Sequence, residues 1–351
     1  MVKPPSSLFK LKSLSSHYAR CKNPVTRVIF SRDMGKGIVR QKVQRAKAYW
    51  KLRQAMNKDW RSFHLLADTD FPKELSIDFW SRWFELLVYS FIKNQKLRLV
   101  NQSITKHGAP DFLVETSDGS QFAVEATMIT AGQTGKNSSA IPAPDFEGNA
   151  TSVVQDVSEI VWENHNGQLV QVANPDSQSK LALRFTTVID SKNRQINKWQ
   201  AKGVLNHDAP VVLAIGTAQA TAETNLRILG ESELLLALYG VGNKFIHFSK
   251  SGEVIDDDTL PTHRHESTVS NHGGSDVPVG LFNDPNFCSI SAVLLCEDQL
   301  FEYGAGKKLL CLNANAAAPV TQNLFGNIPV VEQNNTFVKF TTQRLQSNED
   351  S

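Results

Sequence analysis

The stretch GAPDFLVETSDGSQFAVEAT, residues 108–127, decides the fold. Apolar and polar residues alternate on both sides of residues 117–119, which have the sequence Ser-Asp-Gly. Such alternation around a short loop containing glycine is typical of a β-hairpin. The pattern therefore predicts two antiparallel strands, over residues 111–116 and 121–127.

The register of this hairpin follows from its apolar residues. With residues 117–119 as the loop, Phe112 faces Val124 and all the apolar side chains of one face fall together. The same register places Asp111 opposite Glu125 on the other face, whereas a two-residue loop would scramble the pattern. We therefore expect two carboxylates side by side on neighbouring strands.

A helix is expected immediately before the hairpin, over residues 78–94. Asp78 can accept a hydrogen bond from the first turn, and the following residues are apolar on nearly every side, so the helix should be buried. Glu85 lies in its middle, where a carboxylate needs a cationic partner. A salt bridge to Arg82 is one explanation of Glu85, and a functional role is the other.

The rest of the chain indicates an α/β protein with a mixed β-sheet flanked by helices. After a loop over 130–150, the expected elements are a helix over 151–164, a strand over 181–189, a helix over 191–202 and a strand over 210–216. Further short strands are expected at 233–239, 245–248 and 290–296, with a polar loop over 256–276. The absence of a clean linker favours one elaborated domain over residues 59–351, preceded by a basic N-terminal arm and helix over residues 1–58.

The amino-acid composition argues against a membrane protein, a zinc ribbon and a disulfide-rich protein. The chain has 351 residues, 41% of them hydrophobic, and no apolar run approaches the ~18 residues of a membrane span, so we expect no membrane contact. Its 4 cysteines lack the close pairing of a zinc ribbon or a disulfide framework, which indicates a reducing, cytoplasmic location. The cluster His263, His265 and His272 lacks the spacing of a zinc site and is expected to be an exposed loop.

The charge is divided unevenly. Residues 1–58 contain fifteen basic residues and one acidic residue, although the whole chain carries a net charge of only +2. A basic segment concentrates polyanions, so we expect it to bind nucleic acid. A solvated arm, docking on the acidic body or a protein partner, and an organellar transit segment are the alternatives. The candidate nucleic-acid contacts on the helix predicted over 36–57 are Lys36, Arg40, Lys42, Arg45, Lys47, Lys51 and Arg53.

Residues 78–127 resemble the core of the PD-(D/E)xK (restriction endonuclease-like) nuclease superfamily. The resemblance rests on Pro-Asp at 110–111, the hairpin, Glu125 and a preceding helix with an acidic residue, and extends loosely to residue 215. It implies a restriction endonuclease-like core with additional C-terminal strands. It also implies that Asp111 and Glu125 bind Mg²⁺ or Mn²⁺, joined by Glu85.

One position departs from that superfamily. The residue two after the second acid is usually Lys, and here it is Thr127. The resemblance allows the lysine to come from a following helix, where Lys192, Gln195 and Trp199 share one face of the expected helix. Lys192 would then assist the attacking water and Gln195 would orient it, unless Lys192 is merely a solvated residue in the first helical turn. Weaker candidates for the cation are Lys198, Lys106 and Lys136.

Together these features predict a metal-dependent nuclease that hydrolyses phosphodiester bonds in nucleic acid, with DNA as the first expectation. A catalytically inactive nucleic-acid-binding or assembly module of the same fold is the alternative. Residues 1–351 contain no phosphate-binding Gly-rich loop, nucleophile elbow or dinucleotide fingerprint that would indicate another chemistry.

Overall fold

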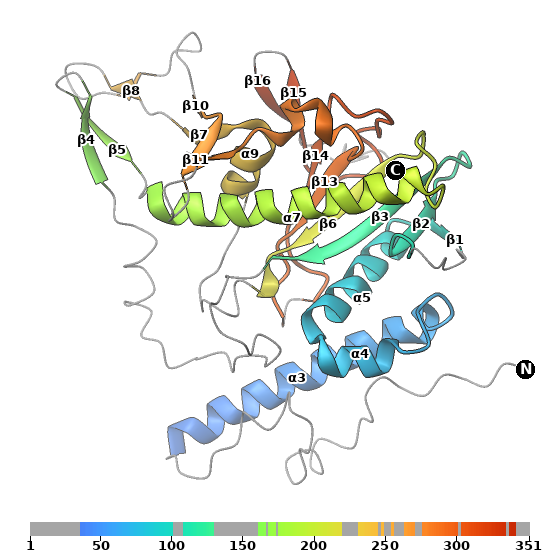
Figure 1. Ribbon diagram of the computed structural model, residues 1–351. Helices are drawn as coiled ribbons and strands as arrows, with labels where there is room; N and C mark the ends of the chain where they lie inside the picture. The colour runs from blue at the N-terminus through green and yellow to red at the C-terminus, as the bar shows by residue number, and fades with distance from the viewer. Residues whose placement is uncertain are drawn as a thin grey trace, which may run out of the picture.

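The computed structural model describes twelve segments of the chain, which together form an α/β protein with one large mixed β-sheet. The described residues are 36–100, 108–129, 161–165, 168–172, 175–219, 231–244, 247–248, 254–255, 263–270, 276–300, 303–334 and 337–341. The sheet has the strand order β1-β2-β3-β6-β13-β14-β15-β16 (Figure 1). These strands are β1 (Arg98–Val100), β2 (Phe112–Glu115), β3 (Gln121–Met128), β6 (Val211–Gly216), β13 (Ala292–Cys296), β14 (Lys308–Leu312), β15 (Val330–Asn334) and β16 (Phe337–Thr341).

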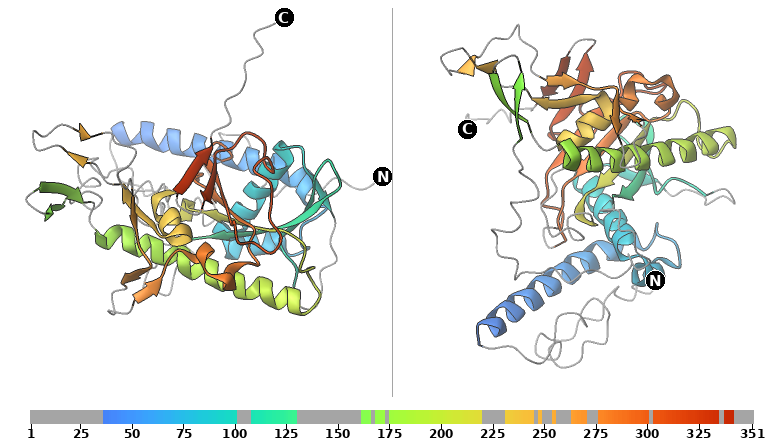
Figure 2. Two further views of the ribbon diagram at one scale, coloured as in Figure 1. Left: turned by 90° about the horizontal axis from the view of Figure 1, so that it is seen from above. Right: turned by 60° about the vertical axis from the view of Figure 1, so that its left-hand side comes forward.

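Helices cover both faces of this sheet, as Figures 1 and 2 show. On one face, α3 (Lys36–Phe63), α4 (Phe71–Ile77) and α5 (Phe79–Asn94) enclose a core with the even-numbered residues of β3 and β6. On the other face, α7 (Pro175–Ala201) and α9 (Glu231–Tyr239) pack on the odd-numbered residues. The short helices η1 (Leu281–Asn283) and η2 (Pro285–Phe287) precede β13. Residues that alternate along β3 therefore belong to two different cores.

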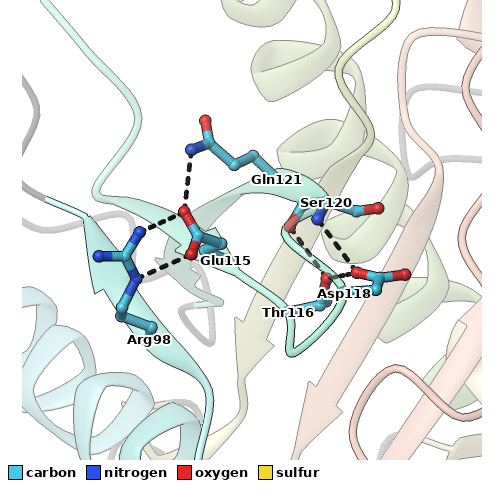
Figure 3. Close-up of polar contacts among 6 residues, drawn as sticks. All are labelled: Arg98, Glu115, Thr116, Asp118, Ser120 and Gln121. Atoms are coloured by element: carbon cyan, nitrogen blue, oxygen red, sulfur yellow. Dashed lines mark hydrogen bonds and ion pairs between the residues drawn. The ribbon is translucent and has the colours of Figure 1, made fainter.

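The predicted hairpin register is confirmed. Phe112 pairs with Val124 and Glu115 with Gln121, so β2 and β3 are antiparallel as expected. The loop needs a left-handed residue, and Gly119 supplies it with φ 86°. Around the loop, Ser120 N–H donates to Asp118 Oδ1 over 3.0 Å, and Arg98 of β1 contacts Glu115 with both Nε and Nη2 (Figure 3). These contacts fix the end of the hairpin opposite the predicted site.

The helix predicted over 78–94 is confirmed as α5. The Asp78 side chain accepts a hydrogen bond from Ser81 N–H, as expected of a helix cap. Trp83, Leu87 and Val88 are fully buried. The helix packs directly on β3, so its polar residues are held close to the hairpin.

The strand predicted over 181–189 is wrong, because these residues belong to α7. A single helix runs from Pro175 through the predicted helix over 191–202 to Ala201. The β-branched run Thr-Thr-Val-Ile suggested a strand, but Ala182, Phe185 and Ile189 recur at helical spacing and are fully buried. The strand predicted over 210–216 is confirmed as β6, and its parallel partners are β3 and β13.

Two further predicted elements are wrong. Residues 233–239, predicted as a strand, lie in α9: its leucines and alanine are good helix formers and lack β-branching. Of the helix predicted over 151–164, residues 161–164 belong instead to β4 (Val161–His165), which pairs with β5 (Gln168–Val172), and residues 151–160 lie outside the described residues. There β-branched and aromatic residues outweigh the helical pattern. The strand expected within 290–296 is confirmed as β13.

The polar segment 256–276 is in part a set of short strands. β10 (His263–His265) pairs with β7 (Val241–Lys244), and β11 (Thr268–Ser270) pairs with β12 (Asp276–Pro278). The predicted strand over 245–248 overlaps β8 (His247–Phe248), which pairs with β9 (Val254–Ile255). His263 and His265 thus lie in a strand, while His272 lies outside the described residues.

Helix α3 is longer than the helix predicted over 36–57 and passes through the expected boundary at residue 58. Leu52, Met56 and Trp60 of α3 belong to the same core as α5. Residues 1–35 of the arm and the loop predicted over 130–150 lie outside the described residues. Across the segments that are described, no helix is both long enough and apolar enough to cross a membrane.

Candidate functional site

The two predicted carboxylates lie beside each other where β2 begins. Asp111 directly precedes β2, and its Oδ2 accepts a hydrogen bond of 2.7 Å from Ala126 N–H of β3. In return, Asp111 N–H donates to Glu125 Oε2 over 3.3 Å. Glu125 is only 3% exposed. The hairpin thus holds both carboxylates through backbone contacts. They lie where β3 continues beyond its pairing with β2.

A lysine from α7 reaches this pair. Lys192 Nζ donates to Glu125 Oε1 over 2.6 Å and to Gln195 Oε1 over 3.1 Å. The predicted common face of Lys192, Gln195 and Trp199 is therefore present. The alternative of a solvated lysine in a first helical turn is wrong, because α7 begins at Pro175 and Lys192 lies deep within the helix.

The same face of α7 also touches the segment that carries Asp111. Trp199 is 3% exposed and lies over Gly108, where an added Cβ would be 3.5 Å from the indole Nε1. Gly108 has φ 83°, which disfavours any side chain. One helix therefore positions both the cation beside Glu125 and the backbone leading to Asp111.

Thr127 lies on the same side of β3 as Glu125, since side chains alternate along a strand. It is half-buried and carries no charge. The cation next to the second acid therefore comes from α7 instead of from β3. Of the weaker candidates, Lys198 is exposed on α7, and Lys106 and Lys136 lie outside the described residues.

Glu85 approaches from the other side of the sheet and has its own cation. Arg82 Nη1 donates to Glu85 Oε2 over 2.6 Å, and Arg82 Nη2 pairs with Glu74 of α4. The salt bridge to Arg82, one of the two sequence-based explanations of Glu85, is thus confirmed. The guanidinium also lies 5.5 Å from the ring centre of Phe71. The metal role of Glu85 remains a prediction.

The carboxylates influence one another electrostatically. Burial and the charge of Asp111 raise the pKa of Glu125 to about 7, against the lowering effect of Lys192. Burial and Asp111 likewise raise the pKa of Glu85 to about 8, although Arg82 opposes the shift. Burial also raises the pKa of Asp111. Burial and mutual repulsion thus outweigh the effects of Lys192 and Arg82, so these carboxyls keep their protons to higher pH, and a bound cation would favour their charged forms.

The donor set is compatible with a hard divalent cation held by two carboxylates. Within the described segments, no group of three His, Cys, Asp or Glu side chains is arranged to hold a metal. Mg²⁺, however, is usually bound by one or two carboxylates and keeps several waters. Asp111 and Glu125 satisfy that requirement in chemistry, burial and charge.

These pKa shifts predict that the metal-free chain becomes less stable as pH rises. Glu85 and Glu125 have pKa values of about 8 and about 7 in the folded chain, above the ordinary 4.5. The folded chain thus holds protons that the unfolded chain releases, so this stabilisation is complete below about pH 4.5 and disappears as pH passes 7 and 8. We expect the thermal midpoint in EDTA to fall by several degrees between about pH 6 and pH 8.5.

The variant Glu85→Gln/Glu125→Gln is the control for this pH dependence. It removes both titrating carboxyls while keeping their size, so its midpoint should change much less between the same two pH values. A wild-type midpoint that rises with pH, or a variant that retains the full wild-type fall, would contradict the assigned environments of Glu85 and Glu125.

One charged group near the site was missed at the sequence level. Asp68 is an exposed acid whose charge raises the pKa of both Asp111 and Glu85. Arg82, which the sequence indicated as the partner of Glu85, is a second cation whose charge also acts on Asp111. The approach of Asp68, in the segment between α3 and α4, depends on tertiary packing and left no local pattern.

The predicted nucleic-acid contacts lie along α3. Lys51 is exposed, but Arg53 is only 6% exposed and faces the body, because its position on the helix falls on the buried side. Lys36, Arg40, Lys42, Arg45 and Lys47 lie in the same helix, N-terminal to the part whose side chains are described.

The fold and site define an α/β protein with a mixed sheet, helices packed against it, and a partly buried cluster of two carboxylates and a lysine where β2 begins beside β3. Comparison with protein-family models, with curated proteins and with solved structures finds no match to this chain.

Proposed function

We propose that the chain is a metal-dependent nuclease of PD-(D/E)xK type that hydrolyses phosphodiester bonds in nucleic acid, with DNA as the first substrate to test. The observation that carries this proposal is the 2.6 Å contact between Lys192 Nζ and Glu125, next to Asp111. A lysine beside the buried Glu125 and the half-buried Asp111 supplies the positive charge that Thr127 lacks.

The order of elements supports the proposal. A helix with an acid (α5), the strands β1 to β3 with Asp111 and Glu125, and a helix with Lys192 (α7) are followed by β6, parallel to β3. This is the arrangement that the sequence resemblance implies for a restriction endonuclease-like core. β13 to β16 then extend the sheet beyond that core.

Each side chain has a role in the proposed reaction. Asp111 and Glu125 would hold Mg²⁺ or Mn²⁺, which lowers the pKa of a water and stabilises charge on phosphate when bound. Lys192 is placed to donate a hydrogen bond to the attacking water or to a phosphate oxygen. Gln195 orients the ammonium through its 3.1 Å contact. Water oxygen forms the new bond to phosphorus, the ester P–O bond breaks, and a proton passes to the leaving oxygen.

Removal of metal tests the proposal directly. Plasmid DNA, single-stranded DNA and RNA would be incubated with the full chain in Mg²⁺, in Mn²⁺ and in EDTA. We expect cleavage of at least one substrate with metal, none in EDTA, and recovery when excess Mg²⁺ is added back. Cleavage that persists in EDTA, or its absence from all substrates with both metals, would contradict the proposed nuclease.

A non-catalytic binding module is the second candidate. It is favoured by the fact that Glu125 already has a cationic partner in Lys192 and that Glu85 has one in Arg82. Such a module would bind nucleic acid with an affinity that falls steeply with salt, and would leave the strand intact in every metal.

A further inference from the structure

Helix α3 carries basic residues in a straight row. With 3.6 residues per turn, six basic residues fall within about a quarter of the helix circumference. We name these residues the basic row: Lys36, Arg40, Lys47, Lys51, Lys58 and Arg61. Lys51, Lys58 and Arg61, which lie in the part of α3 with described side chains, are exposed. Lys42, Arg45 and Arg53 stand on other sides of the helix.

The basic row lies opposite the side of α3 that packs on the body. Leu52, Met56, Trp60 and Phe63 are buried and belong to the core shared with α5. Their positions are about half a turn from the row. Asp59 is the acidic residue of α3, and at 8% exposure it belongs to the buried side. Within the part of α3 whose side chains are described, the row is therefore an exposed surface of one charge, fixed in direction by the packing of the helix.

The length and spacing of the row suit a repeating anion. From its first to its last residue the row spans about 38 Å, with steps of roughly 5–10 Å between neighbouring cations. Phosphates that recur along a nucleic-acid strand match such a row, and each contact releases condensed counterions. A membrane-binding helix would instead need a free apolar face, and in the part of α3 with described side chains the apolar residues Leu52, Met56, Trp60 and Phe63 are buried in the core.

The row fits one strand better than the groove of a duplex. A helix that enters the major groove, about 12 Å wide, has phosphates on both flanks. The C-terminal half of α3 has cations on one side and packed apolar residues on the other. The views in Figure 2 show the N-terminal half of α3 extending away from the sheet, while its C-terminal end lies beside α4 and α5.

We propose that the basic row of α3 binds the phosphate backbone of a single nucleic-acid strand and directs that strand toward Asp111 and Glu125. Phe63, the last residue of α3, lies with its ring centre 6.1 Å from that of Phe112, the residue that follows Asp111, so the helix that carries the row ends near the site. The direction of the strand toward the carboxylates rests on the proposed nuclease function, whereas binding of the strand by the row is independent of that function.

The test compares two charge-matched double variants of the full chain. Lys51→Gln/Lys58→Gln removes two cations of the row, and Lys73→Gln/Lys96→Gln removes two exposed cations outside it. Affinity for a fluorescent 30-nucleotide single-stranded DNA would be measured by anisotropy in EDTA over a range of salt concentrations. Gln is a good helix former, so α3 should persist, and circular dichroism would verify it.

We expect the row variant to make the plot of log affinity against log salt shallower by about 1.4, because each lost phosphate contact removes about 0.7. Its affinity at low salt should fall about tenfold or more, and the off-row variant should change by less than half as much. Equal effects of the two variants, an unchanged slope, or tighter binding of a 30-base-pair duplex would overturn the proposal. So would row-dependent binding to phosphatidylserine vesicles without binding to DNA.

Asp111→Asn separates this proposal from the nuclease. The variant lacks a proposed metal ligand and leaves the row intact, so it should still bind the oligonucleotide in EDTA. If no protein cleaves but the row variant alone loses binding, the nuclease proposal fails and the binding proposal stands.

Discussion

Replacing Asp111 by Asn will lower metal-dependent cleavage by at least about 100-fold, since losing one charge-stabilising group in an active site typically costs that much or more. The amide still offers an oxygen to Ala126 N–H, so the 2.7 Å contact that fixes the side chain can persist. What disappears is the charge that would hold the cation. The measurement is the initial rate of cleavage at saturating Mg²⁺.

The same substitution should stabilise the metal-free chain. The charge of Asp111 raises the pKa of Glu125 and of Glu85, so neutralising it removes a repulsion among buried groups. A higher thermal midpoint together with a lower cleavage rate would show that Asp111→Asn impairs the reaction and leaves the fold intact. Asp118→Asn makes the same change in the exposed loop at the far end of the hairpin and should leave the rate unchanged. Full activity of Asp111→Asn would remove Asp111 from the reaction.

Replacing Lys192 by Met will lower kcat by about 100-fold or more while the protein still binds metal. Met keeps the unbranched apolar stem but has no ammonium, so Glu125 Oε1 loses its 2.6 Å donor. A cation that assists the attacking water acts in the transition state, and its loss appears in kcat more than in KM. Single-turnover rates and KM, each measured at saturating metal, check this.

Two measurements together distinguish a catalytic Lys192 from a structural one: kcat and the pH dependence of metal binding. Lys192 lowers the pKa of Glu125, so Lys192→Met should raise that pKa further above about 7 and shift the pH dependence of metal binding upward. Arg194→Met removes an exposed cation of the same helix and should change neither kcat nor the pH dependence of metal binding. If Lys192→Met kept the wild-type kcat, Lys192 would not be the cation that assists the attacking water.

The hairpin was predictable because its information is local. Alternation with a period of two fixes the faces, and Gly119 fixes the loop, so the pairing of Phe112 with Val124 follows from the sequence. The contacts between Asp111 and the β3 backbone are a direct consequence of that register. The mixed sheet flanked by helices was also expected, and the comparisons leave its narrower classification a proposal.

The elements around the hairpin were predicted less well, because short apolar runs suit both helices and strands. The segment around Phe185 was assigned to a strand although its buried residues recur at helical spacing. Lys192 was nevertheless placed on the correct face, because its spacing to Gln195 holds wherever the helix begins. The proximity of Arg82 and Asp68 to Asp111 arises only when α4 and α5 pack, which no local pattern encodes.

Binding of Mn²⁺ to the full chain at about pH 8, followed by electron paramagnetic resonance, tests most directly whether Asp111 and Glu125 together hold a divalent cation. We expect saturable binding by wild type, retention of that binding in Lys192→Met, and its loss in both Asp111→Asn and Glu125→Gln. Equal Mn²⁺ binding by wild type and the two carboxylate variants would contradict the metal site and, with it, the proposed hydrolysis.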